Sequence, residues 1–278
     1  MIISVASGKG GTGKTTVATN LALSIGKVRF IDCDVEEPNA NIFLKAKIRE
    51  HQDVPIKIPE INRRKCDYCG KCSEFCVYNA LAVVPSDVLV FPELCHSCGG
   101  CALVCPKDAI SWNEQIIGKL EHGQAKNIDF YHGLLNVGEM QAVPVIKELK
   151  KKIAKEGNVI IDAPPGTSCP VIESINSSDY CILVTEPTPF GLHDLKLAIA
   201  VVRHLYIPFG VIINRDGVGD KKVEMYCQTK KIPILMKIPQ SEEIANLYSV
   251  GITFVKKLPE WHERFTELFK RIREEVGT

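Results

Sequence analysis

The stretch Gly8-Lys9-Gly10-Gly11-Thr12-Gly13-Lys14-Thr15 decides the fold, because it follows the pattern G-x4-G-K-[ST]. It lies between an apolar run at residues 2–6, which we expect to be a buried strand, and residues 14–25, whose apolar side chains recur at helical spacing. Here the glycines allow backbone N–H groups to surround phosphate oxygens, and the helix N-terminus adds its positive end. Lys14 would contact the β- and γ-phosphates, and Thr15 would place its hydroxyl on Mg²⁺. The matching context on both sides favours a nucleotide site over a glycine-rich turn without function.

Short apolar runs alternate with helical patterns through much of the chain. A second strand is expected at residues 28–31, later strands at residues 159–161, 181–184, 211–213 and 232–238, and helices at residues 143–154, 192–205 and 221–229. Continuous apolar strands separated by helices are typical of a parallel sheet covered on both faces. Pro233 predicts that the last strand lies near the sheet edge or starts later. The expected fold is therefore α/β, with a doubly wound, mainly parallel sheet.

Acidic residues follow two of the expected strands. Asp32-Cys33-Asp34 comes after the second strand, and Asp162 ends the run 159–162, before a turn that reaches Gly166. The carboxyl ends of parallel strands meet at one edge of a sheet, so these side chains are expected beside the phosphates. We expect Asp34 to orient the attacking water, with Asp32 and Asp162 near Mg²⁺. Gly166 would offer an N–H to the γ-phosphate, and solvated turn acids are the alternative for Asp32 and Asp34.

Eight of the twelve cysteines lie between Cys66 and Cys105, where an internal repeat has an offset of 29 residues. Each half has the spacing C-x2-C-x2-C-x3-C of bacterial ferredoxins, in which the fourth cysteine binds the other cluster. Two zinc knuckles are the weaker alternative, because zinc prefers paired cysteines, often with histidine. We therefore expect two [4Fe–4S] clusters, one held by Cys66, Cys69, Cys72 and Cys105 and the other by Cys95, Cys98, Cys101 and Cys76.

The cysteine region interrupts the α/β pattern. Residues 62–112 are expected to form a small α+β, two-cluster ferredoxin-like insert, which divides the P-loop ATPase into residues 1–61 and residues 113–278. Residues 113–137 are polar and irregular, and could form a hairpin back to the sheet. Val77 stands where a proline follows the fourth cysteine in the ferredoxin pattern, which puts the local turn in question but not the ligands.

The loop with its early lysine, at residues 9–16, resembles the deviant Walker A motif of the MinD/ParA/nitrogenase iron protein class. In that class the early lysine, here Lys9, crosses a dimer interface to the partner's nucleotide, so the resemblance implies an ATP-dependent homodimer. Residues 32–39 and 162–166 resemble the two switch segments of the class, and residues 212–215 and 238–240 resemble its purine-binding segments. The GTPase motif Asn-Lys-x-Asp is absent, because Arg215 follows Asn214, and this favours ATP. With its cysteine region, the chain resembles MinD-superfamily ATPases that contain an inserted ferredoxin domain.

The motifs and the resemblance together define the expected nucleotide site. The expected catalytic residues are Lys9, Lys14 and Asp34. Mg²⁺ is expected at Thr15, Asp32 and Asp162. Contacts to ATP are expected from Gly8, Gly10, Gly11, Thr12, Gly13, Lys14, Thr15, Thr16, Gly166, Asn214, Arg215 and Pro239.

The composition limits the kinds of partner that the protein is expected to bind. A formal net charge of +1 gives no long-range attraction to nucleic acid or to an anionic membrane. The sequence has no leader-like segment and no long apolar run, so we expect a cytoplasmic protein. Residues 260–275 have apolar side chains at helical spacing but five acids against four Lys and Arg, so we expect packing on the core rather than a membrane anchor. Cys169 resembles in position a cluster ligand of the nitrogenase iron protein, but a small packed thiol is the favoured interpretation.

Three functions remain open from the sequence. The first is ATP-gated electron transfer to an unidentified redox partner, because two ferredoxin-type clusters form a path for electrons. The second is a carrier that delivers iron–sulfur or related metal cofactors to an acceptor protein. Carriers resembling this class use a C-x-x-C motif late in the ATPase domain, and none follows Cys105. The third is a positioning ATPase whose clusters sense redox state or stabilise the insert.

Overall fold

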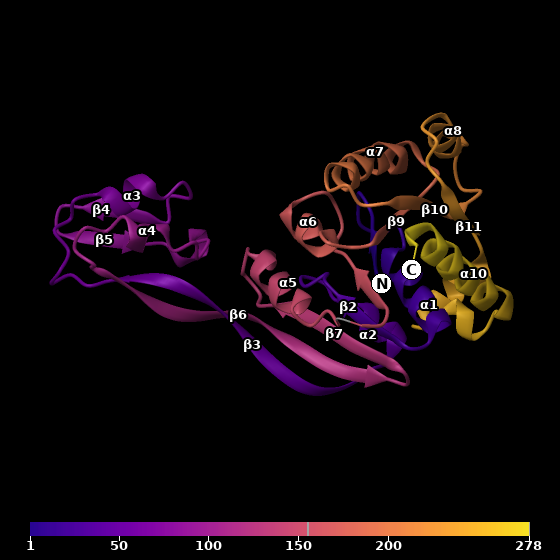
Figure 1. Cartoon of the computed structure of the whole chain (residues 1–278), viewed down its shortest axis with the longest axis horizontal. Coiled ribbons are helices and arrows are strands. Elements are labelled where there is room, and N and C mark those ends of the chain that lie inside the picture. Colours follow the sequence, from indigo (N-terminus) through magenta and orange to yellow (C-terminus); the bar gives the residue numbers. More distant parts are fainter. Residues whose placement is uncertain (155, 278) are drawn as a thin grey trace.

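A sheet of nine strands forms the centre of the larger lobe (Figure 1). This computed structural model describes residues 1–154 and 156–277; residues 155 and 278, both within the expected ATPase part 113–278, lie outside the described residues. The strands of the sheet are β1 (Ile2–Ala6), β2 (Val28–Asp32), β3 (Lys47–Ile61), β6 (Ile110–Ala125), β7 (Ile128–Leu135), β8 (Val159–Asp162), β9 (Tyr180–Thr185), β10 (Phe209–Asp216) and β11 (Ile234–Pro239). Their order is β11-β10-β9-β1-β8-β2-β7-β6-β3.

Pairing is parallel from β11 to β7, whereas β7 with β6 and β6 with β3 pair antiparallel. The mainly parallel α/β fold expected from the sequence is therefore confirmed. The expectation from Pro233 is also confirmed, because β11 starts at Ile234 and lies at the edge of the sheet. Apolar strands in the middle are buried on both faces, which is why they lack a polar alternation.

Helices cover both faces of this sheet (Figure 1). On one face, α1 (Lys14–Ile25) and α10 (Pro259–Val276) pack against side chains such as Phe30 and Ile160. On the other face, α5 (Ala142–Lys150), α6 (Cys169–Ile175), α7 (Pro189–His204) and α8 (Lys222–Thr229) bury Ile161 and Ile213. Two further helices, α2 (Ala40–Leu44) and α9 (Glu242–Ser249), lie near the carboxyl ends of the strands, and a short 3-10 turn at Phe254–Lys256 precedes α10. A second 3-10 turn, Pro92–Leu94, lies between β5 and α4.

The C-terminal helix α10 packs on the core, as its composition predicted. Its five large apolar side chains, at positions three or four residues apart, are buried against α1 and the neighbouring 3-10 turn: Trp261, Phe265, Leu268, Phe269 and Ile272. Among the described residues, no helix has both the length and the apolar character needed to span a bilayer.

Strands β3 and β6 continue beyond the sheet as an antiparallel ribbon. Their pairing runs from Lys47 with Gln124 to Ile61 with Ile110, whereas β7 accompanies β6 only from Gly118 onward. The free part of the ribbon, about eight residues long, extends roughly 25 Å. The expectation of an irregular segment at residues 113–137 was wrong, because this segment forms regular strand apart from its turns, and the hairpin back to the sheet is β6 and β7.

The ribbon carries residues 62–109 as a separate small lobe (Figure 1). This lobe contains α3 (Lys71–Phe75), α4 (Gly100–Leu103) and the hairpin of β4 (Leu81–Val84) and β5 (Asp87–Val90). Its backbone repeats with the 29-residue offset of the sequence. Positive φ angles recur at Tyr68 and Ser97, at Gly70 and Gly99, and at Asn79 and Asp108, so the two halves have the same local turns.

Candidate functional site

The loop between β1 and α1 has the geometry of a phosphate cradle. Gly11 and Gly13 have φ angles of 77° and 94°, and the helix begins immediately afterward at Lys14. A Cβ on Gly13 would lie 2.3 Å from the Asn214 amide nitrogen, and one on Gly8 would lie 2.1 Å from the Asp194 carbonyl oxygen. The loop is held from the side as well, because the Asn214 Nδ2 donates to the Thr12 carbonyl at 2.8 Å. Gly13 is therefore required both by close approach and by backbone conformation, Gly8 by close approach and Gly11 by conformation.

A cavity of about 540 Å³ opens above this loop, at the carboxyl ends of the strands. Its volume is in the range of small-molecule sites. Among the residues expected at the nucleotide, those that line it are Gly10, Gly11, Gly13, Lys14, Thr15, Thr16, Asp34, Asn214, Arg215 and Pro239. The expected residues Gly8, Lys9, Thr12 and Gly166 lie outside the cavity lining. Gly166 instead donates its N–H to the Ser7 carbonyl at 3.0 Å.

The sequence did not identify one wall of this cavity. Ile244, Ala245 and Tyr248 line it from α9, and Val218 lines it from the turn after β10. Tyr248 also stacks on Phe43 of α2, with ring centroids 5.1 Å apart. The signal available in the sequence was weak: Ser241 caps α9 by accepting the Ile244 N–H, directly after the Pro239 segment. An apolar helix face beside a phosphate loop is suited to cover a nucleobase.

Asp162 has the features of a metal-binding carboxylate. It is fully buried, and neither of its oxygen atoms has a hydrogen-bond partner among the described residues. Burial raises its pKa to about 7, although the charge of Lys14 acts in the opposite direction. Buried polar atoms are normally paired, so two unpaired carboxylate oxygens indicate a missing ligand. The residues fit Mg²⁺, with Asp162 and Thr15 as the groups that would hold it.

Asp32 pairs with Asp162 in the sheet register, but its carboxylate is occupied. It accepts the Asp34 and Ala40 N–H groups, both at 3.1 Å, and so closes the loop between β2 and α2. Burial, with the neighbouring Asp162 charge, raises the pKa of Asp32 well above its ordinary value. Asp34 lies beside the cavity, and burial raises its pKa to about 6. Asp34 thus lines the cavity, whereas the carboxylate of Asp32 holds the loop between β2 and α2.

Lys9 does not point into the cavity of this chain. Its Nζ lies 3.6 Å from the Glu186 Oε2, and Arg215 donates to the Glu186 Oε1 at 3.0 Å. Glu186, which follows β9, is only 9% exposed. One buried carboxylate therefore holds two cations that were expected at the nucleotide. No motif in the sequence predicted a role for Glu186, although its place at the end of a buried strand is the same kind of signal as for Asp32 and Asp162.

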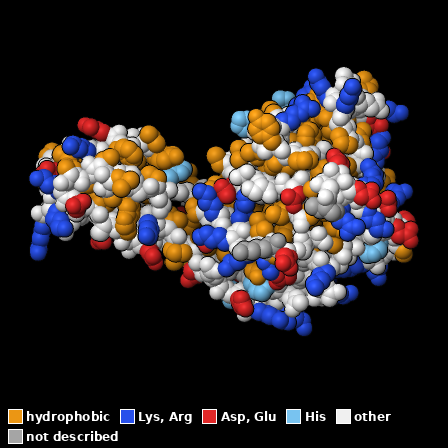
Figure 2. All heavy atoms as spheres, viewed as in Figure 1, with side chains coloured by type: hydrophobic (Ala, Val, Ile, Leu, Met, Phe, Trp, Pro, Cys, Tyr) orange, Lys and Arg blue, Asp and Glu red, His pale blue; other side chains and the backbone are white. Residues whose placement is uncertain are grey.

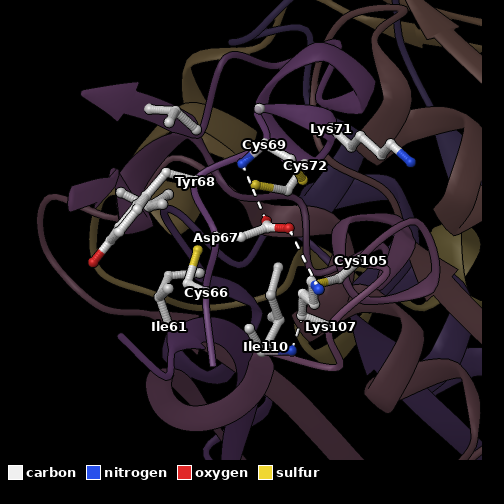
Figure 3. Close-up of a pocket in the computed structure, with 14 residues that line it drawn as sticks. Ile61, Cys66, Asp67, Tyr68, Cys69, Lys71, Cys72, Cys105, Lys107 and Ile110 are labelled. Carbon is white, nitrogen blue, oxygen red and sulfur yellow. Dashed lines mark hydrogen bonds and ion pairs between the residues drawn. The ribbon is translucent and has the colours of Figure 1, made fainter. Parts of the chain in front are cut away.

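The eight cysteines of the small lobe line two cavities. Figure 3 shows one of them, lined by Cys66, Cys69, Cys72 and Cys105, with Asp67 between the Cys69 N–H and Lys107. The structure thus brings together three cysteines of one half and the fourth of the other half.

The second cavity, of about 200 Å³, is lined by Cys76, Cys95, Cys98 and Cys101. It is mainly apolar, and exposed hydrophobic side chains gather on the lobe around it, including Phe75, Val77 and Tyr78 (Figure 2). In both cavities the fourth cysteine has the same support, because the Ala80 N–H donates to the Cys76 Sγ and the Ala109 N–H donates to the Cys105 Sγ, both at 3.4 Å.

These two four-cysteine sets fit iron–sulfur clusters in donor type and grouping. The N–H groups at the sulfur atoms would stabilise thiolates, which are the form that binds iron. Burial raises the pKa of Cys101 to about 11, and burial also raises the pKa values of Cys72 and Cys95. A positively charged iron centre would offset this cost. Among the described residues, no group of three or more His, Cys, Asp or Glu side chains has an arrangement that could hold a single metal ion.

The fold and the loop define a nucleotide-binding P-loop protein. The family model of the CobQ/CobB/MinD/ParA nucleotide-binding domain matches residues 3–254, and the chain belongs to this family of P-loop ATPases. An uncharacterized protein of Methanocaldococcus jannaschii is 33% identical over 269 residues, which cover 92% of each chain. An iron–sulfur cluster carrier protein of Pyrococcus horikoshii is 22% identical over 307 residues, covering 99% of this chain and 88% of the carrier.

Solved structures show the same fold. The septum site-determining protein MinD of Pyrococcus horikoshii, in complex with Mg-ADP, superposes with a TM-score of 0.62 and 21% identity. The similarity covers 99% of this chain and 97% of that protein.

The raised pKa of the buried Asp162 carboxyl predicts how the free energy of unfolding depends on pH. A carboxyl whose pKa is higher in the folded than in the unfolded chain holds its proton on folding, so the contribution of Asp162 to stability without nucleotide falls as pH rises from about 4 to about 7. At about 1.4 kcal/mol per pH unit the full loss would be on the order of 4 kcal/mol. Asp162→Asn should remove this loss, so that the free energy of unfolding of the variant exceeds that of the parent increasingly toward pH 8. Denaturant titrations at pH 5 and pH 8 in a chelator measure this difference.

The matched control is Asp53→Asn, which changes an exposed carboxyl on β3. It should follow the pH dependence of the parent. An Asp162→Asn variant with the same pH dependence as the parent would contradict the assignment.

Proposed function

We propose that this chain hydrolyses ATP, binds two [4Fe–4S] clusters and couples its nucleotide state to electron transfer through them. The observation that carries this proposal is the arrangement of the cysteines: two separate sets of four, mounted on a ribbon that belongs to the same sheet as the phosphate loop. The proposed parts are the ATPase, at residues 1–61 and 113–278, and the ferredoxin-like insert at residues 62–112.

The chain's own residues divide the work at the nucleotide. The cradle at residues 8–15 binds the phosphates through N–H groups, Lys14 balances their charge, and the α9 face excludes water from the base. Asp34 orients the attacking water, and the N–H of Gly166 reaches the γ-phosphate after release from Ser7. Thr15 and Asp162 would hold Mg²⁺, which would supply positive charge to offset the charge of the phosphates. Most catalysis of phosphoryl transfer is positioning and electrostatic stabilisation, which this residue set can provide.

The active species is proposed to be an ATP-dependent homodimer. Lys9 is 33% exposed at its side chain and lies outside its own cavity. It is therefore free to reach the nucleotide of the partner once it leaves Glu186. The partner for electrons is a redox protein of unknown identity, and neither nucleic acid nor a membrane surface is proposed as a partner.

A carrier of iron–sulfur clusters is the second candidate function. It is supported by relatives named as iron–sulfur cluster carriers, such as the protein of Pyrococcus horikoshii. Against it, every cysteine set takes ligands from both halves of the repeat, and Cys95 and Cys101 are buried. Release of a cluster would require the two halves of the cysteine lobe to separate, whereas electrons can pass through the lobe while it stays closed. A positioning ATPase, the third candidate, has support from the MinD fold alone.

The nucleotide assignment predicts different effects for two substitutions. Lys14→Ala removes the charge that meets the phosphates and should abolish ATP binding. Asp34→Ala should leave binding within a few-fold but slow hydrolysis about 100-fold or more, because orienting the water matters only on the way to the transition state. Calorimetry with a non-hydrolysable analogue and phosphate release measure the two effects. Equal loss of binding in both variants would show that Asp34 is misassigned, and preference for GTP would overturn the assignment of ATP.

The cluster assignment predicts about eight iron atoms per chain after anaerobic reconstitution. Cys105→Ser should damage the cluster bound by Cys66, Cys69 and Cys72, although Cys105 lies next to the other cysteines in sequence. Cys169→Ser, which changes a cysteine outside both sets, should retain all the iron. Iron analysis and electron paramagnetic resonance of the reduced protein give the readout. A preparation that holds only stoichiometric zinc would refute the clusters.

The coupling predicts that ATP and electrons influence each other. Binding coupling is reciprocal, so a tenfold difference in ATP affinity between the oxidised and reduced forms corresponds to about 59 mV in a one-electron potential. A redox titration with and without a non-hydrolysable ATP analogue measures this shift, and Lys9→Ala should diminish it. Identical potentials in the parent would refute the coupling. Transfer of clusters to an apo-protein on addition of ATP would favour the carrier instead.

A further inference from the structure

Helix α5 lies on the side of the larger lobe that faces the cysteine lobe (Figure 1). The residue before this helix donates a hydrogen bond to one of the two cysteine loops. Gln141, directly before α5, donates its side-chain Nε2 to the Cys95 carbonyl at 2.6 Å. A second hydrogen bond fixes the same loop to the ribbon, from the Lys57 N–H to the Ser97 Oγ at 2.9 Å. The loop that begins at Cys95 is thus attached to the larger lobe by a side chain of that lobe.

The C-terminal end of α5 is attached to α6. Lys150 donates to the carbonyl oxygens of Glu173 and Asn176, at 2.6 and 2.8 Å, and so caps the end of that helix. The helix α6 begins at Cys169, three residues after Gly166. A displacement of the segment at Gly166 toward a γ-phosphate would therefore reach α5 through Lys150.

The buried face of α5 contacts the other segment at the nucleotide. Val35, next to Asp34, accepts a backbone hydrogen bond from Leu135 at 2.8 Å. A Cβ on Gly133 would lie 2.7 Å from Val35 and 2.8 Å from Val145 of α5, so the three segments pack without space between them. Val35, Val145 and Cys95 are members of one hydrophobic core. Closely packed interiors transmit displacements rather than absorb them.

The other cysteine loop has no comparable attachment. Within the described residues, the hydrogen bonds and ion pairs of residues 66–72 join it to residues 62–109 of its own lobe, as with Asp67 and Lys107. Its apolar neighbours belong to the cluster around Leu81 and Val88, which also contains Cys101 and packs against Ile61 and Ile110 at the end of the ribbon. The two cysteine sites are alike in sequence but differ in their connection to the ATPase.

We propose that Gln141 is a positioning residue that transmits the nucleotide state to the loop at residues 95–101. The site of Cys76, Cys95, Cys98 and Cys101 then responds to ATP, and the site of Cys66, Cys69, Cys72 and Cys105 does not. This inference rests on the proposed coupling between nucleotide and clusters. A shift of the Cys95 carbonyl changes the hydrogen bond from the Ser97 N–H to the Cys95 Sγ, at 3.4 Å, and hydrogen bonds to the sulfur atoms set the potential of a cluster.

The decisive variant is Gln141→Met, which retains the length of the side chain but cannot donate a hydrogen bond. Its matched control is Gln115→Met. Gln115 also donates a side-chain amide hydrogen bond, at 2.9 Å, but to the Glu139 carboxylate in the loop before α5, and no hydrogen bond joins its side chain to the described residues of the cysteine lobe. Both variants are compared with the parent as full-length, cluster-loaded proteins, with equal iron content and equal binding of the non-hydrolysable ATP analogue.

Hydrogen–deuterium exchange and redox titration give two independent readouts. In the parent and in Gln115→Met, the analogue should change exchange at residues 95–101 but not at residues 66–72, and should shift one of two reduction waves. In Gln141→Met, both responses should be lost, although the clusters remain bound.

Each other outcome has a defined meaning. A Gln141→Met protein that responds like the parent overturns the role of Gln141 and leaves the proposed function intact. A response in both loops, or a shift of both waves, overturns the assignment to one site. A parent protein that responds nowhere refutes the coupling itself, and this inference with it.

Discussion

The parallel register of three central strands is the constraint on which the rest of the structure depends. Strand β8 lies between β1 and β2, and the register places Val5 and Asp32 on either side of Asp162. These three strands end at the same level of the sheet. The phosphate loop, the loop after Asp32 and the turn after Asp162 therefore meet at one edge of the cavity. The sheet thereby concentrates carboxylates in a buried place, where burial raises the pKa of both Asp32 and Asp162 and the charge of Asp162 raises that of Asp32 further. Lys14 is the positive group that opposes this within the chain, and the unpaired oxygens of Asp162 leave room for a metal.

A second constraint follows from the antiparallel edge. Strand β6 pairs with β7 inside the sheet and with β3 alone beyond it, so one continuous strand belongs to both lobes. The hydrophobic core under α5 follows this strand outward and includes Ala80 and Cys95 of the cysteine lobe. The connection between the lobes is therefore a packed interior as well as a tether. This is the physical reason why the loop nearer to α5 is the one expected to respond to the nucleotide.

Much of the ATPase could be predicted from the sequence because its signals are local. Strand β1 and helix α1 have the predicted bounds. The helix expected at residues 143–154 corresponds to α5, which begins one residue earlier and ends at Lys150. The grouping of the cysteines also follows from spacing, since the repeat fixes which fourth cysteine reaches across. The features that the sequence did not predict have a common cause, because they are defined by tertiary contacts and not by the local sequence. Strand β3 is polar from Arg49 to Asp53, and its short alternation of Val54, Ile56 and Ile58 is interrupted by Pro55 and Pro59, so the sequence did not mark it as a strand. Its partner β6 supplies the order. Glu186 and the face of α9 gain their meaning only from neighbours far away in the chain, such as Lys9 and Gly13.

The antiparallel ribbon has a consequence for modularity. Because Ile61 pairs with Ile110, the chain leaves and re-enters the ribbon at adjacent positions. The cysteine lobe is thus a cassette that occupies the place of a hairpin turn. A turn of two residues is enough to connect two antiparallel strands in this protein, because Lys126 and Asn127 connect β6 to β7. Exchange of residues 62–109 for such a turn would leave every strand of the large sheet with its neighbours. Gain or loss of the cassette is therefore compatible with an unchanged strand order, although its loss would remove Ala80 and Cys95 from the core under α5.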